Sequence, residues 1–144
     1  MKNTVIIKTR KINEDAKIPS YAHKGDAGLD LFSVIDTQIK PMHRTAIQTG
    51  IEMEIPAGYV GLVWDKSGLS LKEGIKTMAG VIDSSYRGEL KVVMINLSSR
   101  ILHIKKGQKI AQILIQPITT VVVEEEKSLS ETSRGKKGFG STGK

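Results

Sequence analysis

Cysteine is missing from the sequence, and aromatic residues make up only 4% of it. The lack of cysteine excludes disulfide bonds and thiolate metal ligands, and it makes a reducing, cytoplasmic setting the natural expectation. With so few aromatic rings the core must be built from Ile, Val and Leu, which favours strands over helices. No apolar run reaches the length of a membrane span or a signal peptide, so we expect no membrane association. His23, His43 and His103 are far apart and lack ligand spacing, so a metal site built from histidines is not expected.

Basic residues outnumber acidic ones, and the formal net charge is +7. Residues 127–144 carry +4 of this charge, from five basic side chains and one acidic. The remaining charge is too small for the basic stripe with interleaved aromatics that nucleic-acid binding needs, so we expect no nucleic-acid partner. A small polyphosphate is a better match for this charge.

The apolar residues follow the period of two that is typical of strands. At 144 residues the chain predicts one domain, with a β-rich core over residues 1–126 and a flexible, glycine-rich segment over 127–144. The fold class predicted is therefore all-β. The expected strands cover residues 5–7, 29–34, 45–55, 59–63, 101–104 and 109–116, and a single helical turn is expected at 71–74.

The segment Met78–Asn96 predicts two strands folded back on each other around a polar turn. The turn Asp83-Ser84-Ser85-Tyr86-Arg87-Gly88 holds a carboxylate, a phenol ring and a guanidinium. Strands on both sides would hold Asp83 and Tyr86 toward a cavity, as a general base and a stacking ring require. The alternative is an ordinary hairpin with a solvated tip.

Three further features suit a phosphorylated ligand, although each also has a structural explanation. Lys66-Ser67-Gly68, ahead of the expected helical turn, is either a phosphate cradle or a common serine–glycine turn. Asp30 lies within a strand pattern, which suits water or a site. Gln112 lies in an apolar strand and needs hydrogen-bond partners from the protein or from a ligand.

The C-terminal region also has two interpretations. Residues 134–143 combine glycines with Arg134, Phe139, Ser141 and Thr142, so they suit closure over an aromatic, phosphorylated ligand, or they form a solubilising tail. After Pro117, Val121-Val122-Val123 predicts an exposed strand that adds to the sheet of a neighbouring subunit.

Five segments of the chain together resemble, in order, the five motifs of the homotrimeric dUTP diphosphatases. They are Ala27–Leu31, Lys66–Ser70, Ala79–Glu89, Gly107–Gln112 and Arg134–Gly143. The resemblance implies a distorted jelly-roll, a β-clip-like barrel, assembled as a homotrimer with active sites shared between subunits. It also implies hydrolysis of dUTP to dUMP and pyrophosphate by attack of water on the α-phosphorus, which keeps uracil out of DNA and supplies dUMP for thymidylate synthesis.

The same resemblance implies roles for individual residues. Asp83 matches the catalytic carboxylate. Phosphate-binding positions are Lys66, Ser67, Gly68, Gln112, Arg134, Ser141 and Thr142, and the uracil and deoxyribose positions are Gly80, Ile82, Tyr86, Lys91 and Phe139. Mg²⁺ is expected as the cofactor, held by triphosphate oxygens and water, with no direct protein ligand and with Asp30 and Gln112 acting through water.

Two departures from the family pattern stand out. Lys66 replaces the usual arginine, so a two-pronged contact becomes a point charge, and Ser85 stands where an acid is common. Two alternatives remain. The first alternative is a dCTP deaminase, which shares the fold and needs a catalytic glutamate; Glu89 is the only glutamate near the motif. The second alternative is a binding or regulatory module that retained the fold without turnover.

Overall fold

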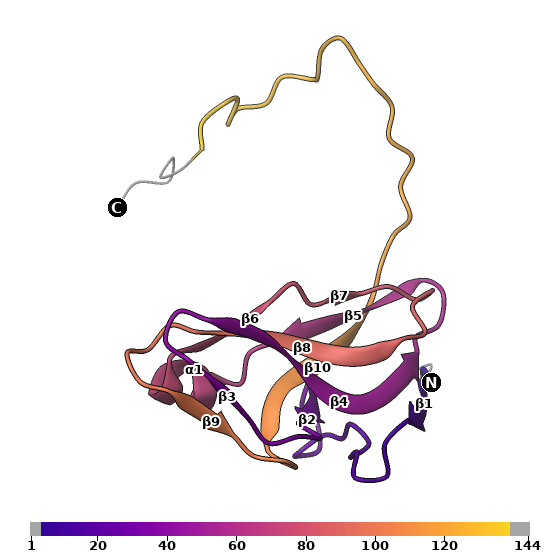
Figure 1. Cartoon of the computed structure of the whole chain (residues 1–144). Helices are drawn as coiled ribbons and strands as arrows, with labels where there is room; N and C mark the ends of the chain where they lie inside the picture. The colour runs from indigo at the N-terminus through magenta and orange to yellow at the C-terminus, as the bar shows by residue number, and fades with distance from the viewer. Residues whose placement is uncertain (1–3, 139–144) are drawn as a thin grey trace.

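The structure is a computed structural model that describes residues 4–138, and these form an antiparallel β body followed by an extended arm (Figure 1). One four-stranded sheet has the order β1 (Lys8–Lys11), β4 (Arg44–Glu54), β8 (Glu89–Asn96) and β6 (Ile75–Met78). The second has the order β2 (Leu29–Phe32), β10 (Lys109–Pro117), β5 (Tyr59–Trp64) and β7 (Val81–Ile82). A smaller sheet pairs β3 (Thr37–Ile39) with β9 (Leu102–Ile104). The predicted all-β, distorted jelly-roll fold is confirmed.

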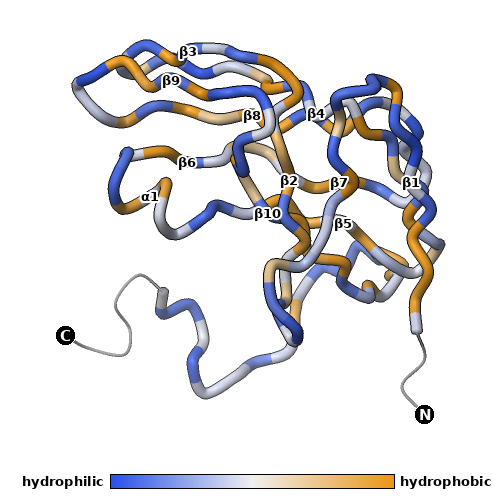
Figure 2. Tube along the Cα trace, turned by 90° about the horizontal axis from the view of Figure 1, so that it is seen from below, coloured by the Kyte–Doolittle hydropathy of each residue, from blue (hydrophilic) through white to orange (hydrophobic). Residues whose placement is uncertain are grey.

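The core lies between the two four-stranded sheets and is almost entirely aliphatic. Buried residues alternate with solvent-facing ones along β8, where Leu90, Val92 and Met94 point inward. Figure 2 shows hydrophobic (orange) and hydrophilic (blue) segments interspersed along the chain of the body. The main cluster draws on both sheets through Ile47, Met53, Ile75, Leu90, Val92, Met94, Leu31, Val63, Ile110 and Ile113.

The first strand differs from the expectation. The predicted strand over residues 5–7 is wrong, because β1 begins at Lys8 and pairs with β4. Lys8 and Arg10 form ion pairs with Glu54 and Glu52 across this pairing, and opposite charges facing each other favour this register.

α1 (Ser67–Glu73) is the one helix among the described residues, and it is longer than the helical turn predicted at 71–74. It ends at Gly74, which has a left-handed backbone (φ 67°) and donates its N–H to Leu69 and Ser70 carbonyls. No helix among residues 4–138 has the length and apolarity to cross a membrane.

The arm leaves the body after β10 and runs clear of both sheets (Figure 1). Ile118 donates its N–H to Gly58 at 2.9 Å, and after this contact the side chains of Val121, Val122 and Val123 are 70%, 87% and 88% exposed. The predicted strand at these valines is not formed in the single chain, because no strand edge lies beside it. The division into a core over 1–126 and a segment over 127–144, and the flexibility of the latter, stay predictions.

Candidate functional site

A pocket of about 300 Å³ opens between β7 and β8, and we call it the β7–β8 pocket. It is lined by Val81, Ile82, Asp83, Tyr86, Glu89 and Lys91. The volume is at the lower end of the range of about 300–1,000 Å³ for ligand pockets. Four of the predicted site residues therefore line one pocket: Ile82, Asp83, Tyr86 and Lys91.

The pocket exists because β7 and β8 belong to different sheets. The predicted hairpin between them is wrong: β8 pairs with β6 through Met78↔Val93, whereas β7 pairs with β5 through Gly61↔Ile82. The strand pattern of residues 78–96 is the same in both arrangements, so the sequence period does not distinguish them.

Ala79 and Gly80 move the chain from one sheet to the other. Both have positive φ, 57° and 102°. The Gly80 carbonyl accepts the N–H of Val63 at 2.8 Å, and a Cβ on Gly80 would lie 2.8 Å from the Val63 carbonyl oxygen. A glycine is therefore required here by both backbone conformation and close approach.

The turn after β7 fixes Tyr86 at several points. Its N–H donates to the Asp83 carbonyl at 3.1 Å, and its hydroxyl donates to the Glu89 carbonyl at 3.0 Å. Arg87 donates to the carbonyls of Ser84 at 2.6 Å and of Tyr86 at 2.9 Å. The Asp83 side chain is left exposed at the mouth of the pocket.

Glu89 connects the pocket floor to a bulge in β4. Its carboxylate accepts the N–H of Gly50 at 3.0 Å and lies 3.6 Å from the Lys91 ammonium. Gly50 lies where the β4–β8 register shifts, between Gln48 and Glu52. The Glu89 carboxylate therefore helps to hold β8 against β4.

A second group of polar side chains surrounds Asp30, and we call it the Asp30 cluster: Asp30, Asp65, Lys66, Lys109 and Gln112. The Asp30 side chain is 2% exposed, although it carries a charge. The Lys66 ammonium lies 2.6 Å from one carboxylate oxygen and the Lys109 ammonium 2.7 Å from the other. Asp30 therefore points away from water, and its charge is matched by two lysines.

The pKa of Asp30 reflects two opposing effects. Burial raises the pKa, but hydrogen bonds and charges from Lys109 and Lys66 outweigh burial and hold the pKa below its ordinary value. Asp30 is therefore ionised throughout the neutral range, and it holds the Lys66 ammonium at the start of α1.

Gln112 anchors the loop that precedes α1. Its side-chain amide donates to the Asp65 carbonyl at 2.8 Å, and a Cβ on Gly28 would overlap the Gln112 side chain, so glycine is needed there. The Asp65 carboxylate accepts the N–H of Thr77 and pairs with Lys76 at 2.7 Å. Burial raises the pKa of Asp65, while the Lys76 and Thr77 contacts outweigh it and lower the pKa overall.

The two groups of residues lie at opposite ends of one sheet. Asp30, Gln112 and Trp64 are aligned across β2, β10 and β5, and Lys66 follows two residues after Trp64. Ile82, by contrast, pairs with Gly61, five residues before Lys66. Gly61 and Trp64 are three strand residues apart, roughly 10 Å, and β7 runs antiparallel to β5, so Asp83 lies further still from Trp64. A single chain therefore does not bring Asp83 and Tyr86 to Lys66 and Gln112.

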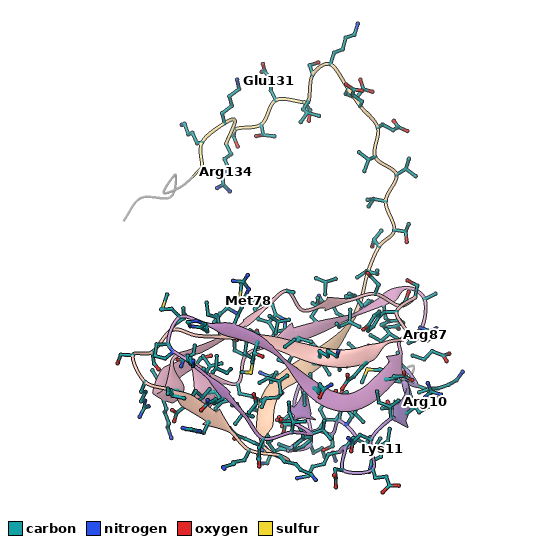
Figure 3. The ribbon with its side chains drawn as sticks, viewed as in Figure 1. Arg10, Lys11, Met78, Arg87, Glu131 and Arg134 are labelled. Carbon is teal, nitrogen blue, oxygen red and sulfur yellow. The ribbon has the colours of Figure 1, made fainter. Side chains whose placement is uncertain are left out.

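The predicted arm residues are also apart from the body. Arg134 lies on the arm, well separated from Arg87 of the turn (Figure 3), and its guanidinium donates to the Lys137 carbonyl at 3.1 Å. The predicted residues Phe139, Ser141 and Thr142 lie outside the described residues. Ser67 and Gly68 are exposed in the first turn of α1.

The described part of the chain offers little to a metal ion directly. It contains no group of three or more His, Cys, Asp or Glu side chains that could hold a metal. Both Asp30 oxygens already contact lysines, and Asp83 is a single exposed carboxylate. These residues fit a metal ion that arrives with an oxygen-rich ligand.

Lys109 and the structural role of Asp65 were not predicted from the sequence. Lys109 is three residues before Gln112, on the strand that pairs with the strand of Asp30. A cation near a buried carboxylate was the signal available, but choosing between the many lysines requires knowing which strands pair.

Comparisons with known proteins agree with this geometry. The sequence model of the dUTPase family matches residues 14–143. The chain is 52% identical over 136 residues to the deoxyuridine 5'-triphosphate nucleotidohydrolase of Clostridium kluyveri, covering 93% of this chain and 95% of the relative. It is also similar to the Staphylococcus bacteriophage 80alpha dUTPase solved with dUpNHpp, at 30% identity and a TM-score of 0.91, over 97% of this chain and 99% of the other. A phage phi11 dUTPase from S. aureus, whose structure shows a coordinated structural Mg(II) ion, has 28% identity and a TM-score of 0.80 over 85% and 97% of the two chains. By sequence and by structure, this chain belongs to the dUTPase family.

Proposed function

We propose that this protein is a dUTP diphosphatase that hydrolyses dUTP to dUMP and pyrophosphate, with water attacking the α-phosphorus. The observation that carries the proposal is the β7–β8 pocket, in which a carboxylate and an aromatic ring border a hollow with the volume of a small ligand site. Membership of the dUTPase family supports the same reaction. The reaction would keep uracil out of DNA and supply dUMP for thymidylate synthesis.

The nucleoside would occupy the β7–β8 pocket. β7 is an edge strand, so its backbone groups on the side away from β5 are available to a ligand. Uracil presents acceptor, donor and acceptor along one edge, which backbone near Gly80 and Ile82 and around Lys91 would match, whereas cytosine would leave groups mispaired. The pocket would exclude the thymine methyl group by contact with its walls, and the Tyr86 ring against the sugar would crowd a ribose 2′-hydroxyl.

Asp83 would orient the attacking water and accept its proton. The carboxylate is exposed at the pocket mouth, where water reaches it. A carboxylate is a weak base at neutral pH, so orientation of the water and charge on the phosphate side must supply much of the barrier lowering.

The triphosphate would be bound by the other end of the sheet from a different copy of the chain. Lys66, Ser67, Gly68 and Gln112 suit phosphate oxygens, but they lie far from Asp83 within one chain. A homotrimer with sites between subunits joins the two ends. Arg134 on the arm would hold the γ-phosphate, with Ser141 and Thr142 nearby and Phe139 stacked on uracil.

Exposed apolar residues of the single chain support such an assembly. Met78, Val93 and Ala46 are aligned across β6, β8 and β4 on the outer face of the sheet, and Met78 is 39% exposed. Figure 3 shows Met78 on the outside of the body. Val121–Val123 on the arm would add a strand to a neighbouring copy.

Mg²⁺ would be the cofactor and would be bound through the triphosphate oxygens and water. When bound it neutralises charge on those oxygens. Asp30 is held by two lysines, and the Gln112 amide nitrogen donates to a backbone carbonyl. In this proposal Asp30 and Gln112 would contact the ion through water.

The test is product analysis with purified protein and its Asp83→Asn variant. We expect the wild-type protein to release pyrophosphate and dUMP from dUTP, and the variant to bind dUTP without turnover. Asp36→Asn, which changes an exposed carboxylate that contacts only the Lys106 N–H, is the control and should keep full activity.

Three results would contradict the proposal. Ammonia release from dCTP would identify a deaminase, which the engaged Glu89 carboxylate does not favour. Nucleotide binding without any turnover by the wild-type protein would identify a regulatory module. Full activity of Asp83→Asn would remove Asp83 as the base.

A further inference from the structure

Gly88 has no role in the proposed reaction, yet it lies directly against the Tyr86 ring. We propose that Gly88 is a specificity-determining residue: its missing side chain lets the Tyr86 ring lie against the backbone, in the orientation that excludes a ribose 2′-hydroxyl. This inference rests on the proposed function, because it assigns a cause to the sugar selectivity of that site.

A side chain at residue 88 has no room beside the Tyr86 ring. A Cβ built on Gly88 would lie 2.5 Å from the Tyr86 hydroxyl oxygen, 2.7 Å from the ring carbon that bears it and 3.0 Å from a neighbouring ring carbon. Non-bonded carbon atoms prefer separations of about 3.5–4.0 Å, so any side chain at residue 88 would overlap the ring. Even a methyl group would require the ring to move.

The ring has little freedom to give way on its own. The Tyr86 N–H, carbonyl and hydroxyl are each hydrogen-bonded, to Asp83, Arg87 and Glu89 respectively. Glu89 is itself fixed, because its carboxylate accepts the N–H of Gly50 in the β4 bulge. A side chain at residue 88 would therefore break the hydroxyl contact and swing the ring about its fixed backbone.

Backbone conformation does not explain the glycine. Gly88 does not have a positive φ, in contrast to Gly80 and Gly50, so an alanine could adopt the same backbone there. The contact with Tyr86 is the reason for glycine that the structure offers. This makes Gly88→Ala a clean perturbation of ring position.

Moving the Tyr86 ring should change how strongly the site selects deoxyribose over ribose. The Tyr86 side chain is 44% exposed and lines the β7–β8 pocket, so one part of the ring packs on Gly88 while the rest faces the ligand space. Pushing the ring away from residue 88 changes its position against the sugar. Rejection of a single hydroxyl by steric contact depends on that position.

The test compares kcat/KM for dUTP and for UTP in the wild-type protein and in Gly88→Ala. We expect the preference for dUTP over UTP to fall by about tenfold or more in Gly88→Ala, the scale at which a pocket discriminates one small group. Ser85→Ala, an exposed position on the same turn, is the control and should keep the wild-type ratio. An unchanged ratio in Gly88→Ala would overturn the inference while leaving the diphosphatase assignment intact. A wild-type protein that does not hydrolyse dUTP would overturn both.

A second measurement covers the case in which Gly88→Ala folds poorly. Thermal unfolding of Gly88→Ala, Tyr86→Ala and the double variant forms a double-mutant cycle. If the added methyl group is in conflict with the ring, then Gly88→Ala should lower Tm in the presence of Tyr86 and have little effect in the Tyr86→Ala background. Equal losses in both backgrounds would mean that Gly88 serves something other than Tyr86, and would overturn the inference.

Discussion

Replacing Asp30 by asparagine tests whether the Asp30 cluster is a functioning electrostatic unit. The carboxylate is 2% exposed and holds Lys66 at 2.6 Å and Lys109 at 2.7 Å. Asparagine keeps the shape, but its NH₂ group would face one lysine, donor against donor, and the charge that balances both lysines would be lost.

The expected loss of stability in Asp30→Asn depends on how exposed the two lysine partners of Asp30 are. Hydrogen bonds to charged groups contribute about 1.5–3 kcal/mol each. The lysine side chains are 30% and 49% exposed, so they can turn toward water after the substitution. We therefore expect Asp30→Asn to lower the free energy of unfolding by about 2 kcal/mol in all, less than the two contacts summed. For a chain of this length that is a fall in Tm of roughly 4–8 °C.

The stability lost in Asp30→Asn should become smaller as the pH falls. The folded-state pKa of Asp30 lies below its ordinary value, so the carboxylate stabilises the fold fully at pH values above about 4 and loses that contribution as pH falls further. The Tm difference between wild type and Asp30→Asn should be complete at pH 7 and shrink at pH 3.

The assay is thermal unfolding at a fixed protein concentration, since assembly also affects Tm. Asp15→Asn is the matched control, because it removes a carboxylate from an ion pair with Lys106 whose side chains are 57% and 48% exposed. It should cost less than about 1 kcal/mol. Equal Tm values for Asp30→Asn and wild type at pH 7, or a difference that persists unchanged at pH 3, would refute the electrostatic reasoning.

Three other perturbations test the remaining parts of the proposed site. Lys66→Arg should restore a two-pronged phosphate contact and lower the KM for dUTP roughly a few-fold in steady-state kinetics; a raised KM would show that the loop is built around lysine. Gly28→Ala should push Gln112 off the Asp65 carbonyl and cost about 1–3 kcal/mol in chemical denaturation, and a neutral result would contradict the close packing. Ending the chain after Ser133 should leave the fold and assembly intact by circular dichroism and sedimentation, but reduce turnover at least about tenfold; unchanged turnover would support a solubilising tail.

The positions of the longer strands were predictable from the pattern of apolar residues in the sequence. In β4, β5 and β10 apolar residues alternate or run continuously, and the predicted ranges agree with the observed ones within one or two residues. Which strands pair was not predictable, because period two says which residues face inward and nothing about the neighbour. The error at β7 has this cause: two residues with positive φ, Ala79 and Gly80, redirect the chain to another sheet.

The residues of the candidate site also divide into those that the local sequence indicates and those that depend on contacts across the fold. Asp83 and Tyr86 could be singled out from the sequence because a polar turn between apolar strands concentrates reactive side chains in a few residues. Asp30 and Gln112 could be singled out because a polar side chain within a strand needs a partner. Lys109 and Gly88 were not found, since the role of each depends on a contact across the fold: Lys109 with Asp30, and Gly88 with the Tyr86 ring.

The central claim is that each site combines Asp83 of one copy with the Lys66 end of another, and mixing inactive subunits tests it most directly. Asp83→Asn and Lys66→Ala proteins would be assayed alone, then unfolded together in equal amounts and refolded. If sites form between copies, random assembly gives about one quarter of the sites both intact groups, so the mixture should regain about one quarter of wild-type activity. If the mixture stays as inactive as its components although mixed assemblies are present, both groups must act within one chain, which contradicts the claim.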